Sequence, residues 1–144
     1  MDSKKIIFKA LVLFCIFQVL IVSCKSSKDT SSKPIKISSK VEDFDSFYDK
    51  FHSDSIFQKS RVNQPLKGQK FDGTEVIHWT KDNFGLVKKR VYDIDTALYK
   101  VNYQKSANEF IQKVWIEDSG YSSEYKFKLI GNKWFLVSVV EYNI

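Results

Sequence analysis

Large aromatic residues follow a helical spacing near the middle of the first half of the chain. They occupy positions 44, 47, 48 and 51, which fall on one face of an α-helix. Ser39 and Glu42 fit the Ser-x-x-Glu capping box that marks a helix start. We therefore expect an amphipathic helix of about 12 residues whose aromatic face is buried.

A second, shorter helix is expected directly after the first. Ser55 and Gln58 form another capping box, and the helix would carry Ile56 and Phe57. The chain then becomes extended, and Pro65 limits that extended segment to the end or edge of a sheet, because proline lacks a backbone donor.

The second half of the chain shows the alternation typical of β-strands. Apolar residues alternate with polar ones over residues 99–103 and 125–129, and residues 110–116 carry apolar side chains on both faces of a further strand. The turn residues 131–132 lead into residues 134–140, which are apolar on both faces and therefore predict a central strand.

Together these elements predict an α+β domain. One or two N-terminal helices precede the strands, residues 74–80 are β-rich, and residues 81–97 show no sustained period. We expect the helices to cover one face of a strongly curved antiparallel sheet, with room for a concave cavity.

The first 23 residues have a different pattern. Lysines precede an apolar run over residues 10–22, broken only by Gln18. That run is shorter than the roughly 20 residues that cross a bilayer but fits the core of an export signal. The sequence Ile21-Val22-Ser23-Cys24 resembles the lipobox of bacterial lipoproteins. The resemblance implies cleavage between Ser23 and Cys24 and acyl chains on the Cys24 thiol; the alternative is a transmembrane anchor with an incidental cysteine.

Three parts are therefore expected along the chain. Residues 1–23 are a lipoprotein signal peptide, residues 24–40 are the lipidated cysteine with a flexible Ser/Lys tether, and residues 41–144 are a single α+β domain. The acyl chains on Cys24 would hold the protein in the bacterial envelope. The outer membrane, facing the periplasm, is favoured because Lys25 replaces the aspartate that commonly retains lipoproteins at the inner membrane.

Charge and cysteine content narrow the function classes. The net charge of +6 lies in the N-terminal parts, because residues 41–144 hold 15 basic and 15 acidic side chains. A neutral, exported domain argues against nucleic acid as a partner. Residues 41–144 contain no cysteine, and the two histidines form no ligand pattern, so we expect no disulfide, metal or cofactor.

Two runs of residues at the ends of the domain carry a family resemblance. The first is Phe44-x-x-Phe47-Tyr48-x-x-Phe51-x-x-Asp54-Ser55-x-Phe57-Gln58-x-Ser60-Arg61-Val62-x-x-Pro65-Leu66. The second is Tyr125-x-Phe127-x-Leu129-Ile130-Gly131-x-x-Trp134-x-Leu136-Val137. Both resemble a known family, domain of unknown function 4348, which occurs in Gram-negative envelope lipoproteins, and hairpins similar to the second close many nuclear-transport-factor-2-like (NTF2-like) domains. The resemblance covers roughly residues 42–141, departs at Gln64, where an aromatic residue is usual, and implies an NTF2-like cone with no established activity.

Three residues are candidates for a binding site. Arg61 either ties the helices to a strand through a carboxylate or carbonyl groups, or faces the cavity and holds an anionic ligand. His78 is either a structural or exposed strand residue, or a proton shuttle. Trp115, like Trp79 and Tyr103, belongs either to the core or to the cavity wall.

Asp93 and Asp95 provide a further pair, either as solvated loop residues or as a metal or acid–base site. The sequence contains no recognised catalytic motif. We therefore expect a non-catalytic module that binds a small molecule or an envelope protein. Two alternatives remain: an enzyme that uses His78 or an aspartate, and a structural protein whose tryptophans fill the cavity.

Overall fold

The computed structural model describes residues 40–144 of the chain. The expected signal peptide, the cleavage site at Ser23 and Cys24, and most of the tether lie outside the described residues. Inside this range, no helix combines the length and apolar character that crossing a bilayer requires.

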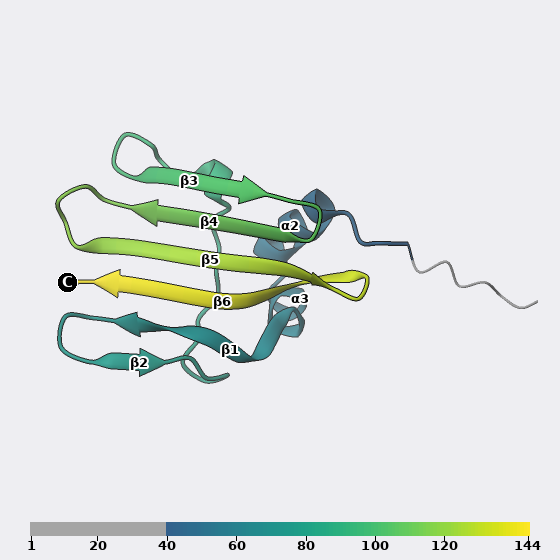
Figure 1. Ribbon diagram of the computed structural model, residues 1–144, viewed down its shortest axis with the longest axis horizontal. Helices are drawn as coiled ribbons and strands as arrows, with labels where there is room; N and C mark the ends of the chain where they lie inside the picture. The colour runs from purple at the N-terminus through teal and green to yellow at the C-terminus, as the bar shows by residue number, and fades with distance from the viewer. Residues whose placement is uncertain (1–39) are drawn as a thin grey trace, which may run out of the picture. The chain divides into compact units, whose positions relative to one another are not determined.

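The described chain begins with two helices and continues with six strands, as Figure 1 shows. A single 3-10 turn, η1, interrupts the long segment between the second and third strands. The bounds are α2 Phe44–Ser53, α3 Ser55–Ser60, β1 Val62–Phe71, β2 Val76–His78, η1 Val91–Asp93, β3 Lys100–Lys105, β4 Glu109–Trp115, β5 Tyr121–Ile130 and β6 Lys133–Asn143.

The strands form one curled sheet in the order β2-β1-β6-β5-β4-β3. The expected α+β class is confirmed, and β6 is central as its apolar character predicts. The expectation of a wholly antiparallel sheet is wrong, because β1 pairs with β6 in parallel. The chain leaves α3, enters β1 and runs in the same direction as β6. The local alternation of apolar and polar residues does not show whether two strands pair in parallel.

Two strands that are consecutive in sequence lie at opposite edges of this sheet. β2 ends at one edge and β3 begins at the other, so the chain between them must cross the whole sheet. We call residues 79–99 the crossing segment. In Figure 1 it runs behind the strands, on the side that also carries α2 and α3. We call this side the inner face and the opposite side the open face.

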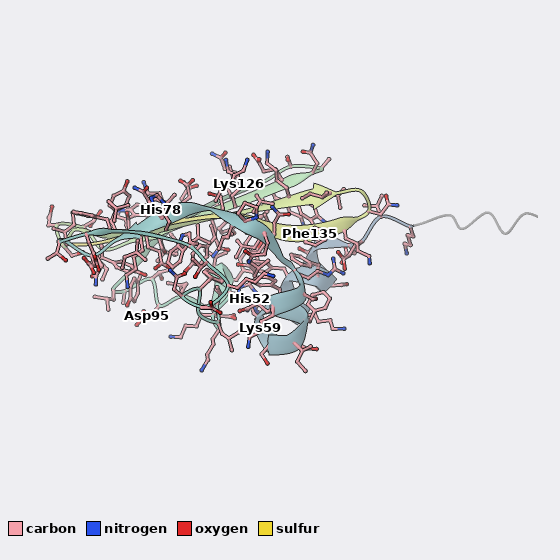
Figure 2. The ribbon with its side chains drawn as sticks, turned by 90° about the horizontal axis from the view of Figure 1, so that it is seen from below. His52, Lys59, His78, Asp95, Lys126 and Phe135 are labelled. Atoms are coloured by element: carbon pink, nitrogen blue, oxygen red, sulfur yellow. The ribbon has the colours of Figure 1, made fainter. Side chains whose placement is uncertain are left out.

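Side-chain directions agree with this division. In Figure 2, Lys126 and His78 lie on the open face, whereas His52, Lys59 and Asp95 lie on the side of the helices and the crossing segment. The inner face is therefore covered by two kinds of chain, regular helix at one end of the sheet and irregular segment at the other.

The aromatic stripe of α2 forms the core against the inner face, as its spacing predicts. The four side chains are at most 4% exposed and pack on inward residues of the sheet. The start of the helix differs from the expected capping box. Asp43 is the N-cap and accepts a hydrogen bond from the Ser46 amide at 2.9 Å, whereas Glu42 lies before the helix and binds elsewhere.

The short helix α3 is also present, with a different cap. Asp54 rather than Ser55 accepts the amide hydrogen bonds of Ile56 and Phe57, both at 3.0 Å. Ile56 is 82% exposed, whereas the polar Gln58 is buried. The sequence order of polar and apolar residues therefore misassigns the buried face of this helix.

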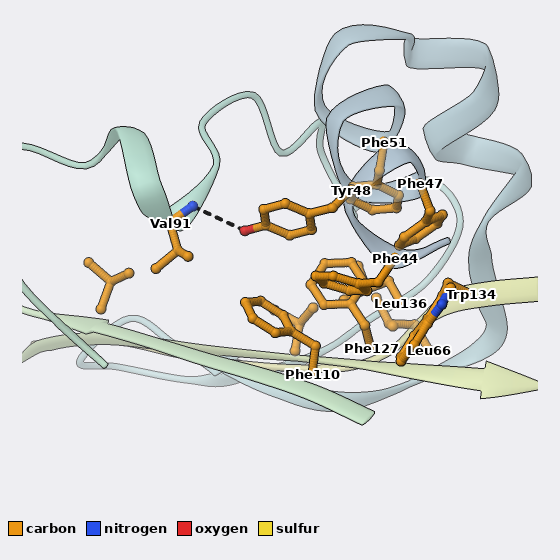
Figure 3. Close-up of a cluster of buried hydrophobic side chains, with 12 residues drawn as sticks. Phe44, Phe47, Tyr48, Phe51, Leu66, Val91, Phe110, Phe127, Trp134 and Leu136 are labelled. Carbon is orange, nitrogen blue, oxygen red and sulfur yellow. Dashed lines mark hydrogen bonds between the residues drawn. The ribbon is translucent and has the colours of Figure 1, made fainter. Parts of the chain in front are cut away.

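Two buried polar side chains tie the crossing segment to the helices. The Tyr48 hydroxyl donates to the side-chain oxygen of Gln112 on β4 and accepts from the Val91 amide at 3.0 Å, the bond drawn in Figure 3. The Gln58 side chain donates to the Val87 carbonyl at 2.7 Å and accepts from the Val87 amide at 2.9 Å. All three bonds to the segment therefore go to its backbone, whose polar groups need partners when buried.

One strand prediction needs correction. Tyr99 and Val101 pack against the core, so residues 99–103 are half-buried as expected, but Tyr103 is 50% exposed on the edge strand β3 and is not a core residue. Pro65 lies in an irregular part of β1, where the pairing with β6 shifts between Val62 and Lys67. Because β2 pairs only with residues 69–71 of β1, Pro65 lies where β1 is the edge of the sheet, as expected, and no ladder donor is missing there.

Removing the Tyr48 hydroxyl should destabilise the domain. In Tyr48→Phe, the buried Gln112 oxygen and the Val91 amide both lose a partner, and each unsatisfied group costs about 1–3 kcal/mol. We expect the free energy of unfolding, measured by urea denaturation, to fall by about 2 kcal/mol or more.

Tyr103→Phe is the matched control. No hydrogen bond joins the Tyr103 hydroxyl to another described residue, so its loss should change the unfolding free energy by less than about 0.5 kcal/mol. Equal stability of the two variants would contradict a central role for the Tyr48 bonds.

Candidate functional site

A hollow lies between the inner face and the crossing segment, at the end of the sheet that the helices do not cover. It has two neighbouring compartments of about 330 and 290 Å³ that share wall residues. The shared residues are Leu86, Val87 and Tyr125. The first compartment is completed by Lys70, Ile77, Trp79, Asn83, Phe84, Gly85 and Glu141, and the second by Lys88, Lys89, Ile94, Asp95, Tyr99, Gln112, Val114, Tyr121 and Ser123.

The floor of this hollow is polar. The side chains at the inward-facing positions of the central strands are apolar under α2 and include several polar ones further along. Under α2, these positions hold Phe110, Phe127 and Leu136, which are fully buried. Further along, the paired inward positions are Gln112 with Tyr125 and Ser123 with Glu141. Alternation along the strands therefore continues, but apolar side chains give way to polar ones beneath the crossing segment.

Tyr125 and Glu141 form the most specific polar contact of the floor. The Tyr125 hydroxyl donates to Oε1 of Glu141 at 2.7 Å across the β5–β6 pair. Burial, followed by the negative charge of Glu141 and this hydrogen bond, raises the pKa of Tyr125. Tyr125 is therefore a protonated donor at neutral pH, and one oxygen of Glu141 remains available to a molecule in the first compartment.

The apolar walls are fixed by their own contacts. The indole N–H of Trp79 donates to the Val139 carbonyl at 2.7 Å, which turns the ring along the inner face. The ring of Phe84 meets Trp79 edge-on at 5.5 Å between centroids. The first compartment thus combines two aromatic rings with a carboxylate, a hydroxyl and the side chain of Lys70.

A third hollow of about 260 Å³ lies between the helices and the crossing segment and contains His52 in its wall. Nδ1 of His52 lies 2.7 Å from the Tyr48 carbonyl and donates to it. Nε2 is buried and has no partner among the described residues. Desolvation is the main cause that lowers the pKa of His52, so the ring is held neutral.

Arg61 lies at the other end of the sheet and does not line these hollows. Its guanidinium forms two bonds with the Glu42 carboxylate, at 2.8 and 3.0 Å, and one with the Trp134 carbonyl at 3.2 Å. Glu42 also accepts the Trp134 amide at 2.8 Å. The side chain of Arg61 is 11% exposed, and its contacts join the start of α2 to β6.

The structure does not bring the other candidate residues together with Arg61. His78 is exposed on the open face, and Trp115 lines a wide hollow of about 450 Å³ on that same face, at the end remote from the helices. Asp93 binds Arg90, and its pKa is lowered mainly by that hydrogen bond. Asp95 lies in the crossing segment and lines the second compartment, and Trp79 lines the first.

Several residues of the hollow were missed by the sequence reasoning. Gln112, Ser123 and Glu141 interrupt otherwise apolar inward positions, and this interruption was the available signal. The sequence does not show that these three residues lie beneath residues 81–97, because that segment has no hydrophobic periodicity. Among the described residues, no group of three or more histidine or acidic side chains is arranged to hold a metal ion.

Comparison with known proteins gives a family match and two similar structures. A family profile matches residues 42–143, which is most of the described chain. A crystal structure of an NTF2-like protein from Bacteroides fragilis is similar at 21% identity and a TM-score of 0.46, covering 72% of this chain and 48% of that one. An NMR structure of a Bacteroides uniformis protein is similar at 22% identity and a TM-score of 0.52, covering 72% of this chain and 78% of that one. The chain belongs to the family of that profile.

The likeness to solved structures concerns the fold alone. The chain spans about half the length of the B. fragilis NTF2-like protein, and the likeness to the B. uniformis structure supports a shared fold at this level of identity. Comparison with curated proteins gave no match. A function must therefore be argued from the side chains of the hollow.

Acid should destabilise the domain through His52. The unfolded chain protonates this histidine below about pH 6.5, whereas the folded state holds it neutral because burial lowers its pKa. The contribution of His52 to stability is therefore complete above pH 6.5 and declines as the pH falls towards the folded pKa. We expect the melting temperature to fall between about pH 7.5 and pH 5.5, and to fall less in His52→Gln.

His78→Gln removes the exposed histidine and should follow the wild-type pH dependence. If His52→Gln and wild type lose the same number of degrees over this range, His52 does not cause the acid sensitivity.

Proposed function

We propose that the chain is a lipid-anchored bacterial envelope protein of the domain of unknown function 4348 type, whose NTF2-like domain binds a small molecule without transforming it. The floor contact between Tyr125 and Glu141, inside a hollow with aromatic walls, is the observation that carries this proposal. Binding sites typically combine apolar walls with a few convergent polar groups. The expected lipid on Cys24 would keep the hollow at the envelope, on the periplasmic side of the outer membrane.

The size and chemistry of the first compartment limit the ligand. Its volume of about 330 Å³ is at the lower end of the range for small-molecule sites. The free oxygen of Glu141 favours a hydrogen-bond donor or a cation, and Trp79 with Phe84 favours an apolar body. A small amphiphile with a cationic or donor group therefore fits better than an anion.

Tryptophan positions argue against a purely structural domain. Trp134 is buried in the core under the helices, Trp79 forms a wall of the hollow, and Trp115 lies on the open face. None of the three fills the space beneath the crossing segment, which is where a structural protein would place them.

One observation also favours an enzyme as the second candidate. A carboxylate with a hydroxyl at 2.7 Å is a minimal arrangement for proton transfer, and the pair of Tyr125 and Glu141 provides it. An enzyme would convert a retained molecule on prolonged incubation, whereas a binding module would release it unchanged. His78 does not take part in this arrangement, because it lies on the open face.

The proposal is tested by native mass spectrometry of the full chain purified from its own envelope. Wild type should retain a small molecule. Glu141→Gln should reduce its occupancy by about tenfold or more, because a hydrogen bond to a charged group contributes about 1.5–3 kcal/mol.

Glu124→Gln is the matched control, because Glu124 lies on β5 beside Tyr125 but faces the open side. It should retain the ligand at the wild-type level. An empty wild-type protein, or equal losses in the two variants, would refute a ligand site at this floor.

A further inference from the structure

The open face of the sheet carries an excess of positive charge. Strand pairing and alternation place six lysines and two glutamates on this face. The lysines are Lys67, Lys100, Lys113, Lys126, Lys128 and Lys133, and the glutamates are Glu109 and Glu124. Because residues 41–144 are neutral with 15 basic and 15 acidic side chains, a face at +4 leaves the rest of the domain at −4.

Four of these lysines lie on neighbouring strands between Ser138 and the β5–β6 turn, and we call them the basic patch: Lys67, Lys126, Lys128 and Lys133. Ser138 on β6 pairs with Lys67 on one side and with Lys126 on the other. Lys128 pairs with Phe135 further along the same strands and forms an ion pair with Glu109 at 3.2 Å. The other three ammonium groups have no ion pair with any described residue.

The basic patch extends from the middle of β6, where Lys67 and Lys126 lie beside Ser138, to Lys133 at the end of the sheet where the described chain begins. The Glu42 amide donates to the Asn132 carbonyl in the β5–β6 turn at 3.0 Å, and Lys133 follows that turn directly. The 17 residues 24–40 span at most about 60 Å when fully extended. An anchor at Cys24 would therefore hold the domain within about 60 Å of the membrane, tethered at the end that carries Lys133.

We propose that the basic patch docks on the anionic phospholipid headgroups of the membrane that carries the anchor, an inference that rests on the lipid attachment of the proposed function. The ammonium groups of lysines are attracted to a negatively charged membrane surface when they lie within about one Debye length of it. The half-buried Phe135 and the 48% exposed Ile130 add apolar surface at the same place. A second copy that presents its own open face is disfavoured as the occupant, because two faces at +4 repel each other.

Docking has a geometric consequence for the hollow. The patch and the hollow lie on opposite faces of the sheet, as Lys126 and Asp95 do in Figure 2. With the open face on the membrane, the crossing segment and the hollow beneath it would point away from the lipid, towards soluble ligands. The charge separation across the domain would thus orient the proposed ligand site.

The test uses the lipidated full chain in vesicles, with a fluorescent NBD label on a single introduced cysteine. Ser138→Cys reports the basic patch, and Lys59→Cys on α3 reports the opposite side. In vesicles of phosphatidylcholine and phosphatidylglycerol at about three to one, the label at position 138 should be quenched by spin-labelled headgroups and the label at position 59 should not. About 0.5 M NaCl, or phosphatidylcholine alone, should remove the quenching.

Charge variants make the result specific. Replacing Lys67, Lys126 and Lys133 by glutamine should lower the docked fraction by about fivefold per lysine. The control variant, with Lys50, Lys59 and Lys88 replaced by glutamine on the other side of the sheet, should leave the quenching at position 138 unchanged. Quenching that persists without the patch lysines, or that is equal at both label positions, would overturn the docking proposal.

Flotation with pure phosphatidylcholine vesicles reports the anchor separately. The lipidated chain should float and Cys24→Ser should not. A chain that floats but shows no quenching at position 138 would overturn the docking and leave the anchor intact. A wild-type chain that does not float would overturn the anchor, and the docking inference with it.

Discussion

The chain must cross one whole face of its sheet between β2 and β3, and the rest of the domain depends on how that crossing is held. About 20 residues without regular structure pass over the inner face, so their backbone polar groups cannot satisfy one another as a helix would. Tyr48 and Gln58 supply the missing partners at Val91 and Val87. Two buried polar side chains thus hold the crossing segment at a fixed height above the strands.

The inner face has two regions with different side chains, one under α2 and one under the crossing segment. Where α2 presses on the sheet, the inward residues are aromatic or aliphatic and are fully buried. Beneath the crossing segment, the inward residues include the polar Gln112, Ser123, Tyr125 and Glu141, and a hollow remains. The same strands therefore supply both the core and the candidate binding floor, and the boundary between them lies at the hydroxyl of Tyr48.

Local patterns predicted the elements whose residues signal their own environment. The spacing of Phe44, Phe47, Tyr48 and Phe51 identified a core-facing helix, and the hairpin around residues 131–132 was equally clear. The parallel pairing of β1 with β6 and the edge position of Tyr103 were not predictable, because both depend on strand order. Glu42 shows the same limit: its sequence context suggests a helix cap, whereas its carboxylate joins Arg61 to Trp134, 92 residues away.

The candidate site was less accessible to sequence than the fold. Of the two roles expected for Arg61, the structure shows the tie between the helices and a strand, because its bonds run within the protein. His78 and Trp115 lie on the open face. Gln58 and Gln112, which organise the hollow, are single polar residues on otherwise ordinary faces. Their importance lies in what they bond across long sequence separations, which composition and periodicity do not record.

The central claim is that Tyr48 and Gln58 fix the crossing segment, and native-state amide hydrogen exchange tests it most directly. The Val87 and Val91 amides donate to these two side chains at 2.9 and 3.0 Å. They should exchange as slowly as amides of the central strand β6, while the exposed Gly85 in the same segment exchanges rapidly. Fast exchange at Val87 and Val91, close to that of Gly85, would show that the segment opens independently of the core and would contradict the account.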